Sequence, residues 1–534
     1  MQRPLILFVF LLLMSCSVAA ADTRIILQVE HRRDALDIEE DTKNYYREKL
    51  KIAFSPESAF SLTTVHCDGM EERRHTWNLV LGDPGRGLYF IAGNFYASFG
   101  SGLLLGTAGP FQPDHFARKG NAGEGPVFSP STSGNPSSSF HGIGAGISIP
   151  FPGFSCSLHS FYSRRERFIS SAEHETGHTE SSISSLEGHR EQEGLRSEPV
   201  HTRTAGGAFA VTVGDYLTLG SHCMYSDLET PEGGPLLFSY SGSEGNGAGY
   251  ESFSGYGFRM EYRDENLTLF AEQDITRSTI VPESRPREEI IGKGTIWGMK
   301  LSLPLLRTSI VRKSLDRDYY SPFTATMGET GYHEGWFWDL KVSPYRNLSF
   351  SSGVSSERRL VPSVQDKEPP VTVLRTFSGT YSWKALEKIQ YSAAFLERTR
   401  NGADEEKQKH RFLIKLRPLR QLTLQGASAF QQNGDTGTSS LHAIGIGVTL
   451  FGRWDISLTG AKAAVAPDNP VYARMLPMRN SNIPGFFIRE DAITAALRTS
   501  LRWGDCYFSL RYFYLQCESG ENRNTVEFFG SGTF

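Results

Sequence analysis

Beyond its N-terminal leader, the chain lacks any stretch that approaches the roughly 18 consecutive apolar residues a membrane-spanning helix requires. A helical membrane protein is therefore not expected. The chain also lacks a charge imbalance, since 55 Lys and Arg residues face 59 Asp and Glu residues and leave a net charge of -4. This near-neutral balance gives no reason to expect nucleic acid as a partner.

Motifs for cofactors and nucleophiles are absent as well. The sequence holds no G-x-S-x-G elbow, Walker loop or Rossmann fingerprint before a helix, so we expect neither an enzyme nor a cofactor. The few cysteines beyond the leader follow no metal-like spacing, and we interpret them as small apolar side chains, although an exported chain could oxidise some. They are Cys67, Cys156, Cys223, Cys506 and Cys517. The last two should lie at opposite ends of one strand, where they cannot easily pair.

The leader has the three parts of a secretory signal peptide. Arg3 supplies the positive start, an apolar stretch runs from Leu5 to Met14, and small residues from Ser17 to Ala21 form a cleavage region. Residues 1–21 are therefore predicted to be removed, which leaves residues 22–534 for the fold. A lipoprotein cleavage site before Cys16 is the alternative, and it would leave a lipidated Cys16 at the new N-terminus.

What the chain does have is a period of two. Between Ile143 and Ile149, and again between Phe508 and Tyr512, large apolar residues alternate with small or polar ones, as in strands with one face toward lipid and one toward a lumen. About two dozen such segments follow one another behind an export signal. With 12% aromatic residues and 53 glycines, this pattern predicts an all-β fold, a transmembrane antiparallel β-barrel in the outer membrane of a Gram-negative cell.

Tight turns between these segments give the strand count. Eleven two-strand hairpins and one strand at each end predict about 24 strands, within a range of 22 to 26, in a single domain. Short turns belong in the periplasm and long loops outside. The turns lie at Ser55–Ser58, Asp83–Gly87, Pro150–Gly153, Val213–Asp215, Arg263–Asn266, Leu303–Leu305, Pro344–Asn347, Lys384–Lys388, Arg417–Arg420, Phe451–Arg453 and Trp503–Asp505. The long loops are expected at Ser98–Ser137, Phe168–His201, Asp227–Ala248, Ile275–Gly292, Leu315–Glu329 and Val465–Phe486.

The last segment, Asn524 to Phe534, ends on an aromatic residue. This ending resembles the signal by which the outer-membrane assembly machinery recognises barrels, so that machinery and outer-membrane lipid are the expected partners.

One region carries a resemblance to a known family. Gly93-Asn94-Phe95 runs into Phe99-Gly100-Ser101-Gly102-Leu103, and Phe161-Tyr162-Ser163 follows. From Tyr45 to about Ser170 the chain resembles the barrel part of a family of Bacteroidetes-type outer-membrane proteins often named for an N-terminal helix-hairpin-helix (competence-type) region. The chain departs from that family in Ser101, where Gln is usual. It also lacks room before Tyr45 for the helix-hairpin-helix module, so DNA binding is not implied.

A barrel of this size needs something in its lumen. Eight strands can be filled by side chains, whereas 16 to 18 leave an aqueous channel. Barrel-like strands begin almost directly after the leader, so a separate N-terminal plug domain is not expected. We therefore hypothesise that residues 98–137 form a constriction or plug loop, starting at Phe99, Gly100, Ser101 and Gly102, whose glycines suggest a kink. An ordinary external loop is the alternative.

A zincin-like pattern, H-E-x-x-H, spans His174 to His178. On a helix the two imidazoles could hold Zn²⁺ with the glutamate as base. The surrounding run is polar and carries Gly177, so a solvated loop is the favoured interpretation; surface metal binding with His189 or His201 is the alternative, and a barrel enzyme a distant one. No metal site is therefore assigned.

Charged residues at inward positions suggest a second functional feature. Arg411, Lys415 and Arg511 could form a basic strip in the lumen that selects anionic solutes. The alternative is pairing of these cations with Glu272, Asp274 or Asp455. A channel or transporter barrel with a loop-occluded lumen and unknown cargo is the function favoured by the sequence. A structural or assembly barrel that holds a periplasmic or lumen-filling partner protein is the second candidate.

Overall fold

The computed structural model describes most of residues 24–533. It leaves out residues 37–42, 56, 68–73, 84–85, 101–102, 105–126, 132–138, 174–178, 183–194, 230–235, 239–247, 283–287, 317–318, 320–332, 360–370, 384–385, 401–402, 435–436, 467–468, 470, 473–486, 489 and 520–521. The predicted signal peptide and Cys16 also lie outside the described residues. In the described part of the chain, no helix is long and apolar enough to cross a membrane.

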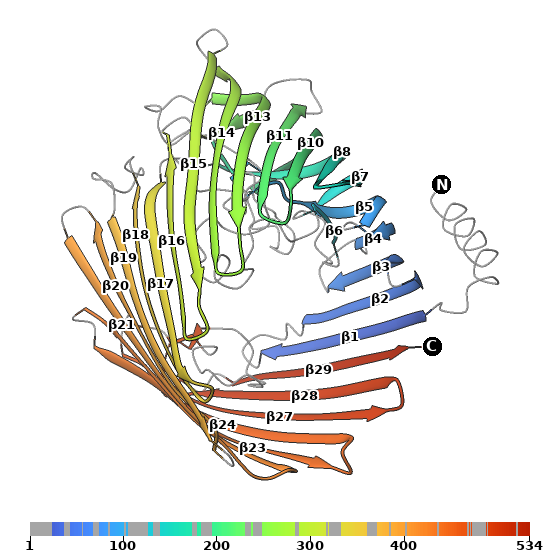
Figure 1. Ribbon diagram of the computed structural model, residues 1–534. Coiled ribbons are helices and arrows are strands. Elements are labelled where there is room, and N and C mark those ends of the chain that lie inside the picture. Colours follow the sequence, from blue (N-terminus) through green and yellow to red (C-terminus); the bar gives the residue numbers. More distant parts are fainter. Residues whose placement is uncertain are drawn as a thin grey trace.

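The described chain folds into an antiparallel β-barrel of 24 wall strands (Figure 1). β1 (Arg24–Leu36) pairs with both β2 and β29, and this pairing closes the ring. The prediction of about 24 strands is confirmed. The other wall strands are β2 (Lys43–Ser55), β3 (Ser58–Cys67), β4 (Arg74–Asp83), β5 (Arg86–Ala97), β7 (Phe140–Phe151), β8 (Phe154–Glu173), β10 (Leu195–Val213), β11 (Leu217–Glu229), β13 (Ala248–Arg263), β14 (Leu267–Pro282), β15 (Glu288–Ser302), β16 (Leu306–Leu315), β17 (His333–Tyr345), β18 (Leu348–Arg359), β19 (Val371–Trp383), β20 (Leu386–Arg400), β21 (Ala403–Leu419), β22 (Leu422–Asn433), β23 (Thr438–Leu450), β24 (Trp454–Ala464), β27 (Ala492–Trp503), β28 (Cys506–Cys517) and β29 (Asn522–Thr533).

Five short strands belong to the long connections. β6 (Phe128–Pro130) pairs with β5, β9 (Thr179–Ser182) with β8, and β12 (Leu236–Phe238) with β13, while β25 (Val471–Tyr472) pairs with β26 (Phe487–Ile488). All eleven short turns fall where the sequence predicted them.

Two predicted loops are too long. The sequence suggested a loop at Ile275–Gly292, but β14 continues to Pro282 and β15 begins at Glu288. It also suggested a loop at Phe168–His201, but β8 continues to Glu173 and β10 begins at Leu195. The polar inner face of β14 persists through Thr276 and Ser278, both buried. A strand that rises above a bilayer needs no apolar outer face, so the loss of alternation did not mark its end.

The two faces of the wall differ as a membrane barrel requires. Large apolar side chains such as Ile143, Ile147 and Leu158 are exposed on the outer face, whereas buried polar groups such as Thr204 and Ser278 lie on the inner face. The outer face therefore suits lipid and the inner face a lumen.

Aromatic side chains mark the turn end of the outer face. Phe151 and Phe154 flank the β7–β8 turn with rings stacked 4.7 Å apart. Other exposed aromatics at this end are Tyr216, Tyr345, Trp383, Phe451, Trp454 and Trp503. Aromatic rings concentrate at the membrane interfaces of outer-membrane barrels, so this band marks one edge of the bilayer.

Candidate functional site in the barrel lumen

The site begins with a bend in β5 at Gly93. The pairing of β5 with β4 ends at Asn78↔Gly93. Beyond this point, β5 pairs with β6 on that side. Gly93 has φ +90°, and a Cβ atom there would overlap the carbonyl oxygen of Trp77 and lie 2.7 Å from its indole ring. Only glycine combines this backbone conformation with so close an approach.

Asn94 fixes the chain just after the bend. Its side-chain oxygen accepts a hydrogen bond from the backbone N–H of Trp77 at 3.2 Å, and its backbone oxygen accepts one from Ser131 at 3.0 Å. Asn78 donates to the carbonyl of Ser131 at 2.8 Å. Strand β6 is thus held beside β5 by side chains as well as by backbone pairing.

The segment that follows lies against the inner wall. We call it the inner segment; its described residues are Ser98–Gly100 and Leu103–Leu104. Phe99 is 1% exposed, and its ring lies 5.9 Å from Phe161 of β8 and 6.3 Å from Phe128 of β6. These rings belong to one buried apolar cluster with Tyr89, Ile91, Phe95, Ala97, Leu104, Phe140, Met224 and Phe253. Burial of this aromatic area stabilises the packing of the inner segment against the wall.

Leucine side chains extend the contact to more distant strands. Leu104 occupies the space above Gly255 of β13, where an added Cβ would overlap its methyl group. Leu103 packs with Ile296 of β15 and Val311 of β16. The inner segment therefore leaves β5 and reaches the wall formed by β13 to β16.

Of the predicted constriction residues, Phe99 and Gly100 lie on the inner wall, whereas Ser101 and Gly102 fall outside the described residues. Gly100 has φ +59°, and a Cβ atom at this position would overlap the carboxylate of Glu272 on β14. The glycine is required by both backbone conformation and contact.

A buried polar cluster lies next to this contact. His222 of β11, Glu272 and Asp274 of β14 place one nitrogen or oxygen atom each within 4.8 Å of the others. Nε2 of His222 is 3.2 Å from Oδ1 of Asp274. The ring of Phe99 lies 6.1 Å from that of His222, so the inner segment covers the cluster.

Tyr319 approaches the same cluster from the connection after β16. Its backbone N–H donates to the carbonyl of Asp316 at 3.1 Å, which turns the chain inward. Burial, together with the charges of Asp274 and Glu272, raises the pKa of Tyr319 well above its ordinary value, so the phenol stays protonated.

A second loop lies on another part of the inner wall. Asn469, between β24 and β27, is 0% exposed. It accepts a hydrogen bond from the side chain of Gln431 at 2.5 Å, and its own amide donates to the carbonyls of Gln431 and Gly437 at 3.0 Å each. Ser439 donates to its carbonyl at 2.7 Å.

Small residues make room for this loop. Ile488 packs into a recess lined mainly by alanines of β22, β23, β24 and β27: Ala427, Ala429, Ala443, Ala461, Ala463, Ala492 and Ala496. Two long connections are thus seated against the inner wall, one on β5 to β16 and one on β22 to β27.

Two cations of the predicted basic strip pair with acids other than those suggested by the sequence. Lys415 lies 2.9 Å from Glu387 of β20, and Arg511 lies 2.7 Å from Glu527 of β29. Lys415 and Arg511 therefore pair with acids on neighbouring strands and not with the three acids named in the sequence analysis. Asp455 accepts a hydrogen bond from Thr449, while Glu272 and Asp274 lie beside His222.

Sequence reasoning missed two further cations on the same face. Lys407 and Lys409 share the inward phase of Arg411 on β21, as Phe412 and Leu416 point outward. In the described part of the chain, none of these three cations forms an ion pair. Period-two counting from Arg411 could have found them.

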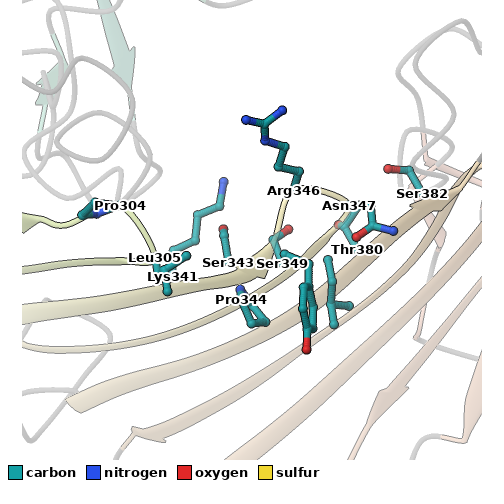
Figure 2. Close-up of a pocket in the computed structure, with 12 residues that line it drawn as sticks. Pro304, Leu305, Lys341, Ser343, Pro344, Arg346, Asn347, Ser349, Thr380 and Ser382 are labelled. Atoms are coloured by element: carbon teal, nitrogen blue, oxygen red, sulfur yellow. The ribbon is translucent and has the colours of Figure 1, made fainter.

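A hollow of about 620 Å³ lies at the turn end, among the β15–β16, β17–β18 and β19–β20 turns (Figure 2). Lys341 and Arg346 point in the same direction from its floor. The hollow adds two cations to the turn end of the barrel. The predicted zincin-like residues His174 and His178 lie outside the described residues.

Comparisons with known proteins bear on the fold. No protein-family model matches the sequence, and no curated protein does. A solved variant of the ferric enterobactin receptor PfeA from Pseudomonas aeruginosa matches 97% of this chain and 81% of its own, with a TM-score of 0.50 and 7% identity. The siderophore receptor PirA from the same organism matches 96% and 80%, with a TM-score of 0.48 and 6% identity. The P pilus usher PapC pore matches 96% and 99%, with a TM-score of 0.42 and 10% identity.

At such identities the likeness to PfeA shows the fold alone. The chain has the large antiparallel β-barrel fold of outer-membrane proteins.

Proposed function

We propose that this chain is an outer-membrane channel or transporter barrel whose lumen is narrowed by its own loops. The observation that carries the proposal is the seating of the inner segment, with Phe99 and Leu104 buried against the lumen wall. An external loop has no reason to bury a phenylalanine and two leucines on that face, whereas a constriction must be held there.

The basic residues on β21 suggest the class of solute. Lys407, Lys409 and Arg411 place three positive charges in succession on the inner face, free of ion pairs in the described part of the chain. Such a row raises the local concentration of anions and lowers that of cations. We therefore propose anionic solutes as the cargo. The ferric enterobactin receptor, whose fold is similar, is by its name a receptor for an iron complex.

Planar-bilayer recording on the purified barrel tests the proposal. The decisive variant replaces residues 98–137 with a short Gly-Ser linker. Phe95 and Phe140 are register partners, so such a linker can join β5 to β7 and keep their pairing. We expect small conductance for the intact chain and a larger conductance for the variant. Silence of both proteins would contradict a pore and favour a barrel that holds a partner protein, which pull-down from membranes would then identify.

A matched control replaces residues 360–370, between β18 and β19, with the same linker. Arg358 and Val371 are register partners, so this loop also joins adjacent strand ends. Its conductance should equal that of the intact chain. Kinship with the helix-hairpin-helix-named barrel family remains a separate proposal, supported by the Gly93-Asn94-Phe95 and Phe99-Gly100 residues.

A further inference from the structure

One row of register partners brings histidine and aspartate together. His222 of β11 pairs with Gly257 of β13, and Gly257 pairs with Asp274 of β14. A Cβ atom at Gly257 would overlap Oδ1 of Asp274 and lie 2.6 Å from Nε2 of His222. The glycine in the middle strand is therefore what lets the two side chains meet above the sheet.

Glu272 supplies a third donor. It precedes Asp274 by two positions on β14, so both side chains point into the lumen. All three side chains are buried, with exposures of 5% for His222, 3% for Glu272 and 0% for Asp274.

Asp274 is the least satisfied member of the cluster. In the described part of the chain, neither of its carboxylate oxygens has a partner with hydrogen-bond geometry, although Nε2 of His222 is close. The buried hydroxyl of Tyr319 is likewise without one. Tyr319 packs over Gly294, which is the register partner of Asp274 on β15. Buried carboxylates that lack hydrogen bonds are costly unless a cation neutralises them.

The protein cations nearby are mostly engaged. Arg259 of β13 is ion-paired with Glu261, which also holds Arg263 at 2.5 Å. Lys313 of β16 shares the register row of Glu272, with Ile296 of β15 between them. Lys313 can offset one carboxylate, which leaves Asp274 facing His222.

We propose that His222, Glu272 and Asp274 form a binding site for a first-row divalent metal ion of the Zn²⁺ class. One imidazole nitrogen and two carboxylate oxygens are a donor set that such ions accept. Metal–ligand bonds of about 2.0–2.2 Å place donors roughly 3 to 3.5 Å apart, so donors within 4.8 Å of one another close on an ion through small rotations. Tyr319 stands beside the site, and the inner segment covers it through Phe99 and Gly100.

Zn²⁺ titration of the full chain in detergent, followed by calorimetry and by metal analysis after desalting, tests the proposal. His174→Ala and His178→Ala are introduced throughout, so that the loop histidines cannot contribute. We expect one tightly held Zn²⁺ per chain. Asp274→Asn keeps the shape of the side chain and should weaken binding by at least about 100-fold, as should His222→Ala.

Gly257→Ala keeps all three donor residues but places a methyl group where the side chains of His222 and Asp274 meet, so it should weaken binding to a similar degree. Gly460→Ala is its matched control, because Gly460 also lies in a wall strand and an added Cβ there meets nothing within 4 Å. His442→Ala and Asp339→Asn control for the loss of a histidine and of a carboxylate elsewhere in the wall. Each variant is first shown to migrate as a folded barrel on unheated gels.

Two results would overturn the site. Absence of tight Zn²⁺ from the starting protein would mean that Lys313 and a protonated His222 neutralise the carboxylates. Equal Zn²⁺ binding by the starting protein and by folded Asp274→Asn and His222→Ala would place the ion elsewhere. The proposal does not depend on conductance, so it stands or falls separately from the channel.

Discussion

Gly100 of the inner segment lies directly against the carboxylate of Glu272 on β14, with no room for a Cβ atom between them. Through this contact, the inner segment that follows β5 reaches Glu272, one of the three residues of the polar cluster. A glycine with φ +59° thus decides whether the segment can seat on the wall.

Gly100→Ala should unseat the inner segment. The left-handed conformation alone costs alanine about 1 kcal/mol or more, and the overlap with Glu272 adds to this. We expect larger conductance and faster proteolysis within residues 98–131. Gly153→Ala is the control, since Gly153 has φ +82° in the β7–β8 turn with nothing within 4 Å of an added Cβ. Equal behaviour of the two variants would show that backbone strain, and not wall contact, produces the effect.

Gly93→Ala should destabilise the whole barrel. Its Cβ would meet the backbone of Trp77 in the neighbouring strand, where neither strand can move freely. Gly87→Ala is a close match, because φ is +87° there and the added Cβ meets nothing within 4 Å. In denaturant unfolding from lipid vesicles, we expect Gly93→Ala to lose about 2 kcal/mol more than Gly87→Ala. Similar losses would mean that the bend at Gly93 tolerates a side chain.

Asn469→Ala should release the second inner loop. The substitution leaves the buried carbonyls of Gln431 and Gly437 without their donor, which costs about 1–3 kcal/mol per unsatisfied group. Amide hydrogen exchange around Val471 and Ile488 should accelerate, while exchange in the wall strands should not change. Gln432→Ala is the control, because Gln432 is exposed. Unchanged exchange in Asn469→Ala would show that the alanine recess holds the loop without this hydrogen-bonded residue.

The carboxylate of Asp264 stabilises the β13–β14 turn through hydrogen bonds that depend on pH. The backbone N–H groups of Asn266 and Leu267 donate to its carboxylate at 2.8 and 2.7 Å, and these bonds lower the pKa of Asp264. A lowered folded-state pKa means that the contribution is full above the ordinary value of 3.8 and is lost as pH falls through the folded-state pKa. Relative to base-line exchange in a short peptide, protection of the two amides should therefore fall in acid below pH 3.8. In Asp264→Ala, protection should be low at every pH; an acid-dependent loss in that variant would point to another group.

The wall could be predicted from the sequence because its signals are local. Period-two alternation and the turn residues each occupy a few consecutive positions, so all eleven turns were predicted correctly. Phe99 and Gly100 were selected from a local glycine pattern, and both lie on the inner wall. His222 was missed, because it meets Asp274 only through two pairings and an intervening Gly257 on separate strands. Strand register determines such a cluster, and alternation alone does not specify which inner residue faces which.

The same limit applied to the basic strip. Inward positions of Arg411, Lys415 and Arg511 follow from alternation, but their partners depend on neighbouring strands. The sequence therefore offered acids on strands that do not pair with β21 or β28, whereas Glu387 and Glu527 lie in adjacent strands.

Arg411 should contribute more to ion selectivity than Arg511. Arg411 has no ion-pair partner in the described part of the chain, whereas the charge of Arg511 is offset by Glu527. In bilayers under a salt gradient, Arg411→Glu combined with Lys409→Glu should shift the reversal potential from anion toward cation preference. Removal of the whole pair, by Arg511→Gln together with Glu527→Gln, should shift it little, because the net charge of the lumen is then unchanged. Lys293→Glu provides a control on the outer face of β15, where Ile291 and Trp297 are exposed in the same phase. A reversal potential that responds to Lys293 as strongly as to Arg411 would place the selective region outside the lumen and contradict the basic strip.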